Sequence, residues 1–333
     1  MRIFFVSSLT ELITCRAISL SGIETKQEIF CFFGSKGSIP PKLYNEFIQL
    51  SSRLKHQIVI DAVEVSGRVS AFAQPATLGD IVEAIRSLFD GLSITEIFTN
   101  SLEKGFIAGA MKLFPDARVA LYDNGLVSHL DMPIYTGEWR IRRRRAGPIA
   151  QESMSRVEIA YFSLLEHLPV PAQLAGKEVK GISAEALRLA TQEAHDNWAD
   201  LVPTLPSDYT EILIGTSFYK TERISFEEER NAYLEVVERL SERGRKVAYK
   251  EHPRATERPL LTTADNVMVI DSSIPVEVIC QDNPFLDAYS ISSSSLFTLN
   301  KMMGTRMHAI GGDIADDLFP QVVSLFRKTI GPA

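Results

Sequence analysis

Short apolar runs alternate with amphipathic stretches through the first part of the chain. Apolar runs of strand length occupy residues 2–6, 28–33, 56–63, 96–99 and 118–122. Between them, apolar residues recur at helical spacing over residues 9–20, 42–54, 78–88 and 105–113. Strands that alternate with helices in this way are typical of a largely parallel sheet with helices packed on both faces.

The same alternation resumes in the second part of the chain. Strands are expected at 211–214, 247–249, 267–270 and 288–291, and helices at 226–242, 275–280 and 316–328, with one more helix beginning at the serines of 292–295. Residues 137–171 are less regular, an amphipathic helix follows at 184–198, and Pro203 and Pro206 indicate a hinge. We therefore expect an α/β fold with two doubly wound, Rossmann-like domains that face each other across a cleft. The N-terminal domain would cover residues 1–205 and the C-terminal domain residues 206–333.

Composition and charge exclude several classes of protein. The 333 residues suffice for two domains, and a net charge of −7 disfavours nucleic-acid binding, which favours a basic surface. No apolar run is long enough for a membrane helix, and the N-terminus is typical of a buried strand rather than a signal peptide. The three cysteines are scattered, which favours reduced thiols in a cytoplasmic protein.

Polar residues gather where the expected strands end. In the first domain, Asp123, Asn124 and Gly125 follow the strand at 118–122. In the second domain, the residues at strand ends and helix starts are Gly215, Thr216, Lys250, His252, Pro253, Pro275, Glu277 and the run Ser292 to Ser295. Doubly wound sheets bind ligands at the carboxyl ends of their strands, so these clusters form the candidate site.

The residue types in these clusters suit phosphate and acid–base chemistry. A His at the mouth of a strand, followed by a Pro of fixed φ, is a natural phosphate or proton-transfer position, as at His252. The N–H groups and hydroxyls of Ser293, Ser294 and Ser295 at a helix start suit a phosphate. Each feature also has a structural explanation: Asp-Asn-Gly and His-Pro occur in turns, serines cap helices, and Glu277 can complement a helix dipole.

Motifs of other enzyme classes are missing from the sequence. No cluster has metal-ligand spacing, so we expect no bound metal, and the single histidines His129 and His308 are interpreted as structural. There is no glycine-rich dinucleotide or P-loop motif and no nucleophile elbow. A basic block at 139–145 is compatible with a solvated loop, and equally with contact to an anionic acceptor or to the acidic inner membrane surface.

The ordered motifs resemble those of bacterial sialyltransferases of the two-domain glycosyltransferase B type. That family carries an acidic pair before a Gly in its N-terminal domain, a His-Pro in its C-terminal domain and a serine pair near the C-terminus. Here these places hold Asp123-Asn124-Gly125, His252-Pro253 and a pair within Ser292 to Ser295, and two lesser marks are matched by Lys250 and by Pro275-x-Glu277. The resemblance covers residues 118–298 and departs from the family at Asn124, where the second acidic residue is missing.

The resemblance implies an inverting, metal-independent transfer of sialic acid, or a related nonulosonic acid, from its CMP-activated donor to an acceptor hydroxyl. The acceptor would be a glycan such as lipooligosaccharide or capsule. Asp123 would be the base and His252 would assist the departure of CMP. The implied donor-binding residues are Gly125, Gly215, Thr216, Lys250, Pro253, Pro275, Glu277, Ser293, Ser294 and Ser295.

The resemblance also implies partners and a location. The partners would be the CMP-activated sugar and the glycan acceptor, and the protein would be cytoplasmic with peripheral contact to the inner membrane. Two alternatives remain open. One is another nucleotide-sugar enzyme of the same fold that uses a different donor, and the other is a nucleotide- or sugar-binding module without catalysis, as Asn124 would permit.

Overall fold

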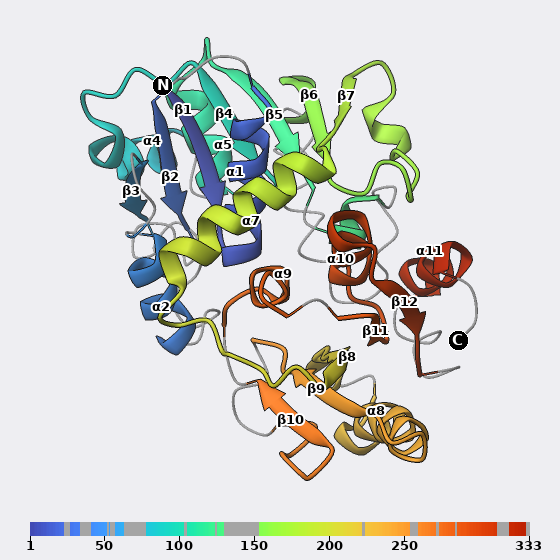
Figure 1. Cartoon of the computed structure of the whole chain (residues 1–333). Helices are drawn as coiled ribbons and strands as arrows, with labels where there is room; N and C mark the ends of the chain where they lie inside the picture. Colours follow the sequence, from blue (N-terminus) through green and yellow to red (C-terminus); the bar gives the residue numbers. More distant parts are fainter. Residues whose placement is uncertain are drawn as a thin grey trace. The chain divides into compact units, whose positions relative to one another are not determined.

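The chain folds around two parallel sheets in the computed structural model (Figure 1). The structure describes residues 1–22, 27–33, 41–51, 53, 57–62, 78–102, 105–123, 125–129, 153–221, 224–253, 259–270, 273–283, 285–311 and 320–330. Every pairing between named strands of the described part is parallel. The α/β fold of two doubly wound sheets expected from the sequence is therefore confirmed.

The first sheet has seven strands in the order β3-β2-β1-β4-β5-β6-β7. Its strands are β1 (Arg2–Val6), β2 (Glu28–Phe32), β3 (Gln57–Asp61), β4 (Glu96–Thr99), β5 (Arg118–Tyr122), β6 (Val157–Phe162) and β7 (Glu178–Gly181). Successive strands are added on one side of β1 up to β3 and then on the other side from β4 onward. The order of the strands along the sheet therefore reverses between β1 and β4. Side chains of a strand alternate between the faces, and Phe4 stacks between Phe30 and Phe98 on one face of the central strands.

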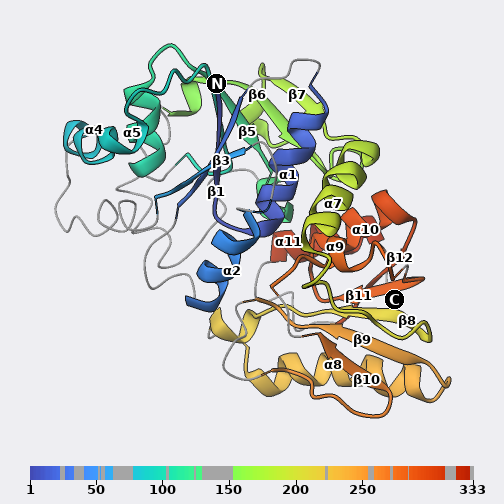
Figure 2. The same cartoon turned by 60° about the vertical axis from the view of Figure 1, so that its left-hand side comes forward.

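Helices cover both faces of the first sheet (Figure 2). They are α1 (Leu9–Leu20), α2 (Pro41–Ser51), α4 (Leu78–Arg86) and α5 (Gly105–Leu113). Ile85 of α4 and Phe106 of α5 pack with Ile3 and Phe5 in one buried cluster, whereas Phe47 of α2 stacks on Phe32. The aromatic and β-branched side chains that predicted the strands thus form the core between the helices and the sheet.

Strands β6 and β7 were not expected from the hydrophobic pattern. Strand β6 lies between β5 and β7 and buries most of its residues, with Glu158 exposed, whereas β7 is mostly exposed along its length. Strand β7 is at the edge of the sheet, and an edge strand buries few side chains and carries polar residues, so its sequence is hard to distinguish from a loop. The basic block at 139–145 lies outside the described residues.

The second sheet has five strands in the order β10-β9-β8-β11-β12. Its strands are β8 (Tyr209–Ile214), β9 (Lys246–Lys250), β10 (Val267–Ile270), β11 (Asp287–Ser290) and β12 (Arg306–Ala309). The order reverses between β8 and β11. In open sheets of this kind, ligands bind outside the carboxyl ends of the strands at such a reversal. Strand β12, a polar edge strand, was also missed by the sequence pattern.

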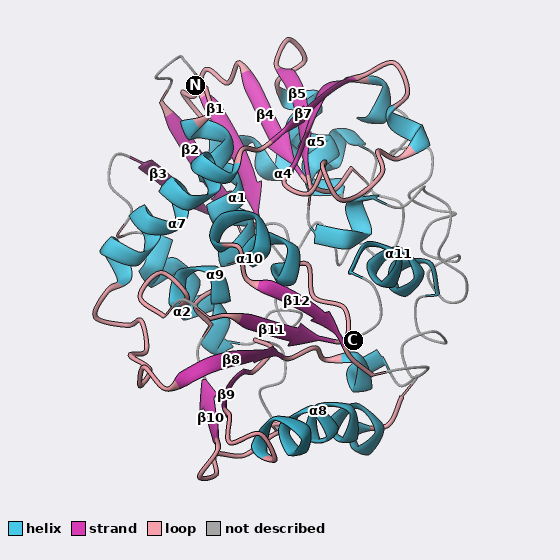
Figure 3. Cartoon of the chain, turned by 45° about the vertical axis from the view of Figure 1, so that its right-hand side comes forward, coloured by secondary structure: helices cyan, strands magenta, loops and turns pink. Residues whose placement is uncertain are grey.

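The helices of the second sheet are α8 (Phe226–Ser241), α9 (Val276–Ile279), α10 (Ser295–Met303) and α11 (Pro320–Ile330). Figure 3 shows α8 on one side of the strands and α9 and α10 on the other. Tyr233 of α8 packs with Leu213, Tyr249 and Tyr289 of the sheet. A reciprocal pair of bonds between Ser225 and Glu228 caps the start of α8 and satisfies two of its free N–H groups.

The chain divides into two compact units that do not follow one cut in the sequence. Unit 1 holds Met1–Asn124, Asp131–Leu165 and Val170–Ala186, and unit 2 holds Gly125–Leu130, Glu166–Pro169 and Leu187–Ala333. All strands of the first sheet precede residue 205 and all strands of the second follow it. Helix α7 (Ala184–Trp198) lies mostly in unit 2, as do Pro203 and Pro206. The domain boundary predicted at residues 205 and 206 stays a prediction.

Candidate functional site

Gly215 brings the end of β8 against the end of β9. Its N–H donates to the carbonyl of Lys250 at 2.9 Å. A Cβ added at Gly215 would lie 2.7 Å from the hydroxyl of Tyr249 and 3.1 Å from both the N–H nitrogen of His252 and the Lys250 carbonyl. Only a residue without a side chain allows this approach, so Gly215 fixes the distance between two loops at the carboxyl edge.

Thr216 is buried and its polar groups are held within the protein. Its hydroxyl donates to Oε1 of Glu229 at 2.5 Å, and its N–H donates to the hydroxyl of Tyr233 at 3.0 Å. Glu229 is fully buried on α8 and also accepts from the N–H of Tyr219 at 2.7 Å. Thr216 therefore anchors the loop after β8 to helix α8.

Lys250 and His252 occupy the end of β9, as expected from the sequence. The Lys250 side chain is buried and its Nζ donates to the carbonyl of Glu251 at 3.0 Å. His252 is half-buried, and its N–H donates to Oε1 of Glu251 at 2.9 Å. Pro253 is also half-buried and precedes residues 254–258, which lie outside the described part.

Glu277 connects the end of β9 to the serine run. It lies on α9 and is buried, and its carboxylate accepts a hydrogen bond from the Ser295 hydroxyl. Burial raises the pKa of Glu277, while the bond from Ser295 and the positive charge of Lys250 act in the opposite direction. Pro275 is the N-cap of α9, one position before the place expected for it, and its carbonyl accepts from the N–H of Val278 at 3.0 Å. The structure thus brings Lys250, Glu277 and Ser295 together.

The serine run forms the start of α10. Ser294 is the N-cap residue, yet it makes no side-chain capping bond, while Oγ of Ser293 accepts from the N–H of Ser295 at 3.3 Å. Gly125, which has a φ of +71°, lies against this turn, since a Cβ there would be 2.6 Å from Oγ of Ser294. Two motifs that are far apart in the sequence therefore meet in unit 2.

Asp123 lies at the end of β5 in unit 1. It is 3 % exposed, and its Oδ2 accepts from both the N–H of Ser163 at 3.0 Å and the Ser163 hydroxyl at 2.5 Å. Ser163 directly follows β6, the neighbouring strand. Two donors from one residue orient the carboxylate. Asn124 lies outside the described residues.

Sequence patterns missed three side chains that hold the expected site residues. They are Glu251 and Glu229 in unit 2 and Ser163 in unit 1. Glu251 stands between Lys250 and His252 and could have been singled out by that position, but Glu229 and Ser163 reach their partners only through the fold. His129 also gains a partner, because its Nδ1 lies 2.9 Å from the carbonyl of Pro169.

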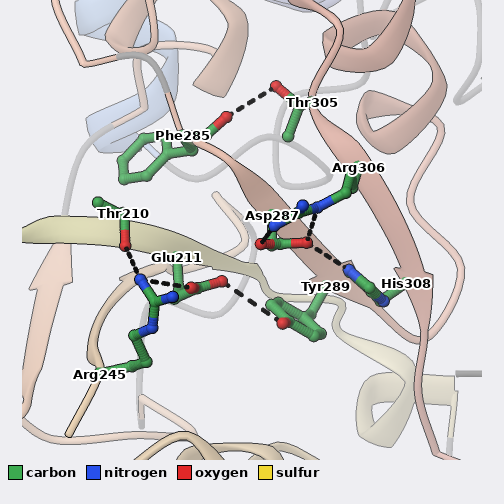
Figure 4. A network of polar contacts seen from close by, with 9 residues as sticks. All are labelled: Thr210, Glu211, Arg245, Phe285, Asp287, Tyr289, Thr305, Arg306 and His308. Carbon is green, nitrogen blue, oxygen red and sulfur yellow. Dashed lines mark hydrogen bonds and ion pairs between the residues drawn. The ribbon is translucent and has the colours of Figure 1, made fainter. Parts of the chain in front are cut away.

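A separate polar network lies at the amino end of the second sheet (Figure 4). Arg306 of β12 makes two bonds to Asp287 of β11, and His308 approaches the same carboxylate at 2.6 Å. Arg306 and then His308 hold the pKa of Asp287 at about 2, against the effect of burial. Glu211 of β8 is buried beside them, and burial raises its pKa. His308 thus has a structural partner far along the strands from the candidate site.

The described part of the chain has neither a metal-binding cluster nor a membrane-spanning helix. No group of three or more His, Cys, Asp or Glu residues described there is arranged to hold a metal ion. The predicted independence of the reaction from metal stays a prediction. Among the described helices, none combines the length and apolar character that crossing a bilayer requires.

The two parallel α/β sheets have the fold of the glycosyltransferase B type, which solved structures of several nucleotide-sugar enzymes share. A UDP-N-acetylglucosamine 2-epimerase from Neisseria meningitidis bound to UDP-N-acetylglucosamine is similar at a TM-score of 0.50, with 11 % identity over 100 % of this chain and 95 % of that one. A UDP-glucosyltransferase from Polygonum tinctorium is similar at a TM-score of 0.51, with 12 % identity over 92 % of this chain and 79 % of that one. These likenesses concern the fold alone.

The model of the alpha-2,8-polysialyltransferase family matches residues 2–309. The chain belongs to this family and is a glycosyltransferase. No curated protein matches it in sequence. The resemblance to sialyltransferases inferred from short motifs is therefore confirmed at the level of the family.

Proposed function

We propose that the protein transfers sialic acid, or a related nonulosonic acid, from its CMP-activated donor to a hydroxyl of an acceptor glycan. The observation that carries this proposal is membership of the polysialyltransferase family over residues 2–309, a span that includes Asp123, His252 and the serine run. The grouping of Lys250, Glu277 and Ser295 at the carboxyl edge of the second sheet supports it, because this edge is where doubly wound sheets bind nucleotides.

The proposed reaction proceeds with inversion and without a metal. Asp123 takes the proton from the acceptor hydroxyl, and the acceptor oxygen forms a bond to the anomeric carbon as the bond to the CMP phosphate breaks. His252 donates a hydrogen bond or a proton to the departing phosphate. The hydroxyls of Ser293 and Ser294 donate hydrogen bonds to it, which stabilises the charge that develops there, while Ser295 holds Glu277 beside the site.

The other side chains have distinct proposed tasks. Lys250 contributes positive charge close to the phosphate and stabilises the buried Glu277. Glu277 accepts hydrogen bonds from the ribose hydroxyls of the donor in addition to the one from Ser295. Gly215 lets the donor approach the backbone, and Gly125 packs closely on Ser294. The proposed acceptors are lipooligosaccharide and capsular glycans.

CMP release tests the proposal directly. The purified protein should release CMP from CMP-sialic acid in the presence of chelator, when given acceptors that end in galactose or in sialic acid. Asp123→Ala should lower kcat by a factor of roughly 100 or more with little change in CMP affinity, whereas His252→Ala should weaken both.

UDP-N-acetylglucosamine serves as the control donor. Turnover of this donor without release of CMP from any nonulosonic donor would assign the chain to the other nucleotide-sugar chemistry of this fold. Normal transfer by Asp123→Ala would show that another group removes the proton.

A further inference from the structure

Glu251 is a buried carboxylate that binds both ends of the loop carrying His252. Its Oε1 accepts from the hydroxyl of Tyr249 at 3.0 Å and from the N–H of His252 at 2.9 Å. Its Oε2 accepts from the N–H of Leu260 at 3.0 Å. Residues 252 and 260 flank the segment 254–258, so one side chain holds the chain before and after that segment.

A carboxylate in this place is costly for the fold. Glu251 is 8 % exposed, and burial raises its pKa, while the bonds from Leu260, His252 and Tyr249 and the charge of Lys250 act in the opposite direction. A buried ionised group survives only when its charge and lone pairs are partnered. Its partners here are mainly backbone N–H groups of the loop, so its contribution is to the position of the backbone.

The N–H of His252 is confined from two directions. Glu251 accepts its hydrogen bond on one side, and Gly215 lies so close on another that a Cβ there would be 3.1 Å from the same nitrogen. Lys250 adds a third constraint, because its Nζ donates to the carbonyl of Glu251 at 3.0 Å. The peptide unit between Glu251 and His252 is therefore held at both its carbonyl and its N–H.

We propose that Glu251 is a positioning residue that places His252 for its contact with the leaving phosphate. The inference rests on the proposed function, since His252 acts there on the departing CMP. Both oxygens of Glu251 accept hydrogen bonds from groups of the protein, so its proposed role is to hold the backbone and not to bind the donor. Misplacement of a catalytic group by about 1 Å can lower a rate by a factor of the order of 100, so the effect should appear in kcat.

Glu251→Gln is the central variant. It keeps the size of the side chain but replaces one acceptor oxygen with a donor, which opposes the N–H of Leu260 or of His252. We expect kcat for transfer to fall by a factor of roughly 10 to 100 and the KM for the donor to change by less than about threefold. Amide hydrogen exchange at His252 and Leu260 should become faster.

Tyr249→Phe is the milder variant, in case Glu251→Gln folds poorly. It removes one donor to Glu251 and keeps the buried ring, and we expect a loss in kcat of about two- to fivefold. Glu211→Gln is the matched control. It neutralises another buried Glu of the same sheet, at the opposite strand end (Figure 4), and should leave kcat and the exchange at His252 unchanged.

A double-mutant cycle separates positioning from general stability. If Glu251 acts through His252, then Glu251→Gln should have little further effect on kcat or on CMP affinity in a His252→Ala background. If Glu251→Gln lowers kcat equally in the wild-type and His252→Ala backgrounds, or if Glu211→Gln lowers kcat as much as Glu251→Gln does, the inference is overturned. Transfer by the wild-type protein would still uphold the proposed function in either case. A wild-type protein that releases no CMP from any nonulosonic donor would overturn both.

Discussion

At the scale of single residues, the candidate site depends on small groups in restricted places. Gly215 and Gly125 have no side chain, which allows a close approach, since a Cβ at either position would collide with a neighbouring turn. The N–H and the hydroxyl of Ser163 both donate hydrogen bonds to the Asp123 carboxylate. The chemistry proposed for Asp123 and His252 therefore relies on neighbours that take no part in the reaction themselves.

Gly215→Ala tests the close approach at the carboxyl edge. The new Cβ would contact the Tyr249 hydroxyl and the backbone of residues 250 and 252, and the backbone contacts cannot move as a flexible side chain would. We expect a loss of about 1–3 kcal/mol in the free energy of unfolding and a raised KM for the donor. Urea unfolding and donor kinetics measure the two effects.

Gly181→Ala is the control for this substitution. A Cβ at Gly181 would meet only the Leu165 side chain, at an ordinary 3.6 Å. Its unfolding free energy should change by less than about 0.5 kcal/mol and its kinetics not at all. A Gly215→Ala protein that behaves like this control would show that the two loops do not need the close approach.

At the scale of elements, the second sheet carries different chemistry at its two strand ends. The carboxyl ends of β8 and β9 lead into the loops held by Glu229 and Glu251. The amino ends of β8, β11 and β12 carry the network of Glu211, Asp287 and Arg306 shown in Figure 4. Because the strands are parallel, the two groups lie at opposite ends of the sheet, and one can be changed without the other.

The network at the amino ends predicts how stability depends on pH. The pKa of Asp287 is about 2 in the folded protein and about 3.9 in an unfolded chain. A lowered pKa means that the ionised carboxylate stabilises the fold above about pH 4, and this stabilisation is lost as the pH falls toward 2. The raised pKa of Glu211 works in the opposite sense, since its ionised form destabilises the fold.

Asp287→Asn should therefore be less stable than the wild type near pH 6. The difference in unfolding free energy should shrink to about half at pH 3, measured by urea unfolding at both values. Relief of the charge repulsion on Glu211 will offset part of the loss. A difference that does not vary with pH would contradict an electrostatic role for the pair with Arg306.

At the scale of the whole molecule, sequence order and compactness divide the chain differently. The segments Gly125–Leu130 and Glu166–Pro169 belong to unit 2 although they lie between strands of the first sheet. There, Lys301 of α10 pairs with Glu166 at 2.6 Å, and Phe297 contacts the ring of His167. Unit 2 is thus completed by short segments from the first half of the chain.

Two fragments test how unit 2 is assembled. Helix α7 buries Trp198 completely, and the hydroxyl of Thr191 approaches the sulfur of Met302 at 3.7 Å. A fragment of residues 206–333 lacks α7 and should not unfold cooperatively in urea, because the surface under the helix would be exposed. A fragment of residues 184–333 should recover part of the cooperativity. Circular dichroism measures the unfolding of both fragments. Equal behaviour of the two fragments would argue that α7 is dispensable for unit 2.

The central strands and long helices follow from the sequence because their patterns are local. The strand Arg2–Val6 is buried on both faces and the helix Leu9–Leu20 mainly on one. Burial of this kind sets the spacing of the apolar residues, which can be recognised in the sequence directly. The edge strands β7 and β12 were missed because an edge strand buries little and tolerates polar residues, whereas β6 is an interior strand within the irregular stretch 137–171. Their pairing partners are set by the sheet and not by their own sequence.

The candidate site divides in the same way. The sequence by itself determined which residue types could act, since His252, Lys250, Glu277 and the serines lie at strand and helix ends that local patterns reveal. Only the tertiary structure decided which of them meet and what holds them: Ser295 with Glu277, Ser294 with Gly125, and Glu251 with both ends of the His252 loop. The physical reason is that period and propensity act over a few neighbouring residues. The partner of a buried polar group is whichever donor or acceptor the fold brings within hydrogen-bonding distance.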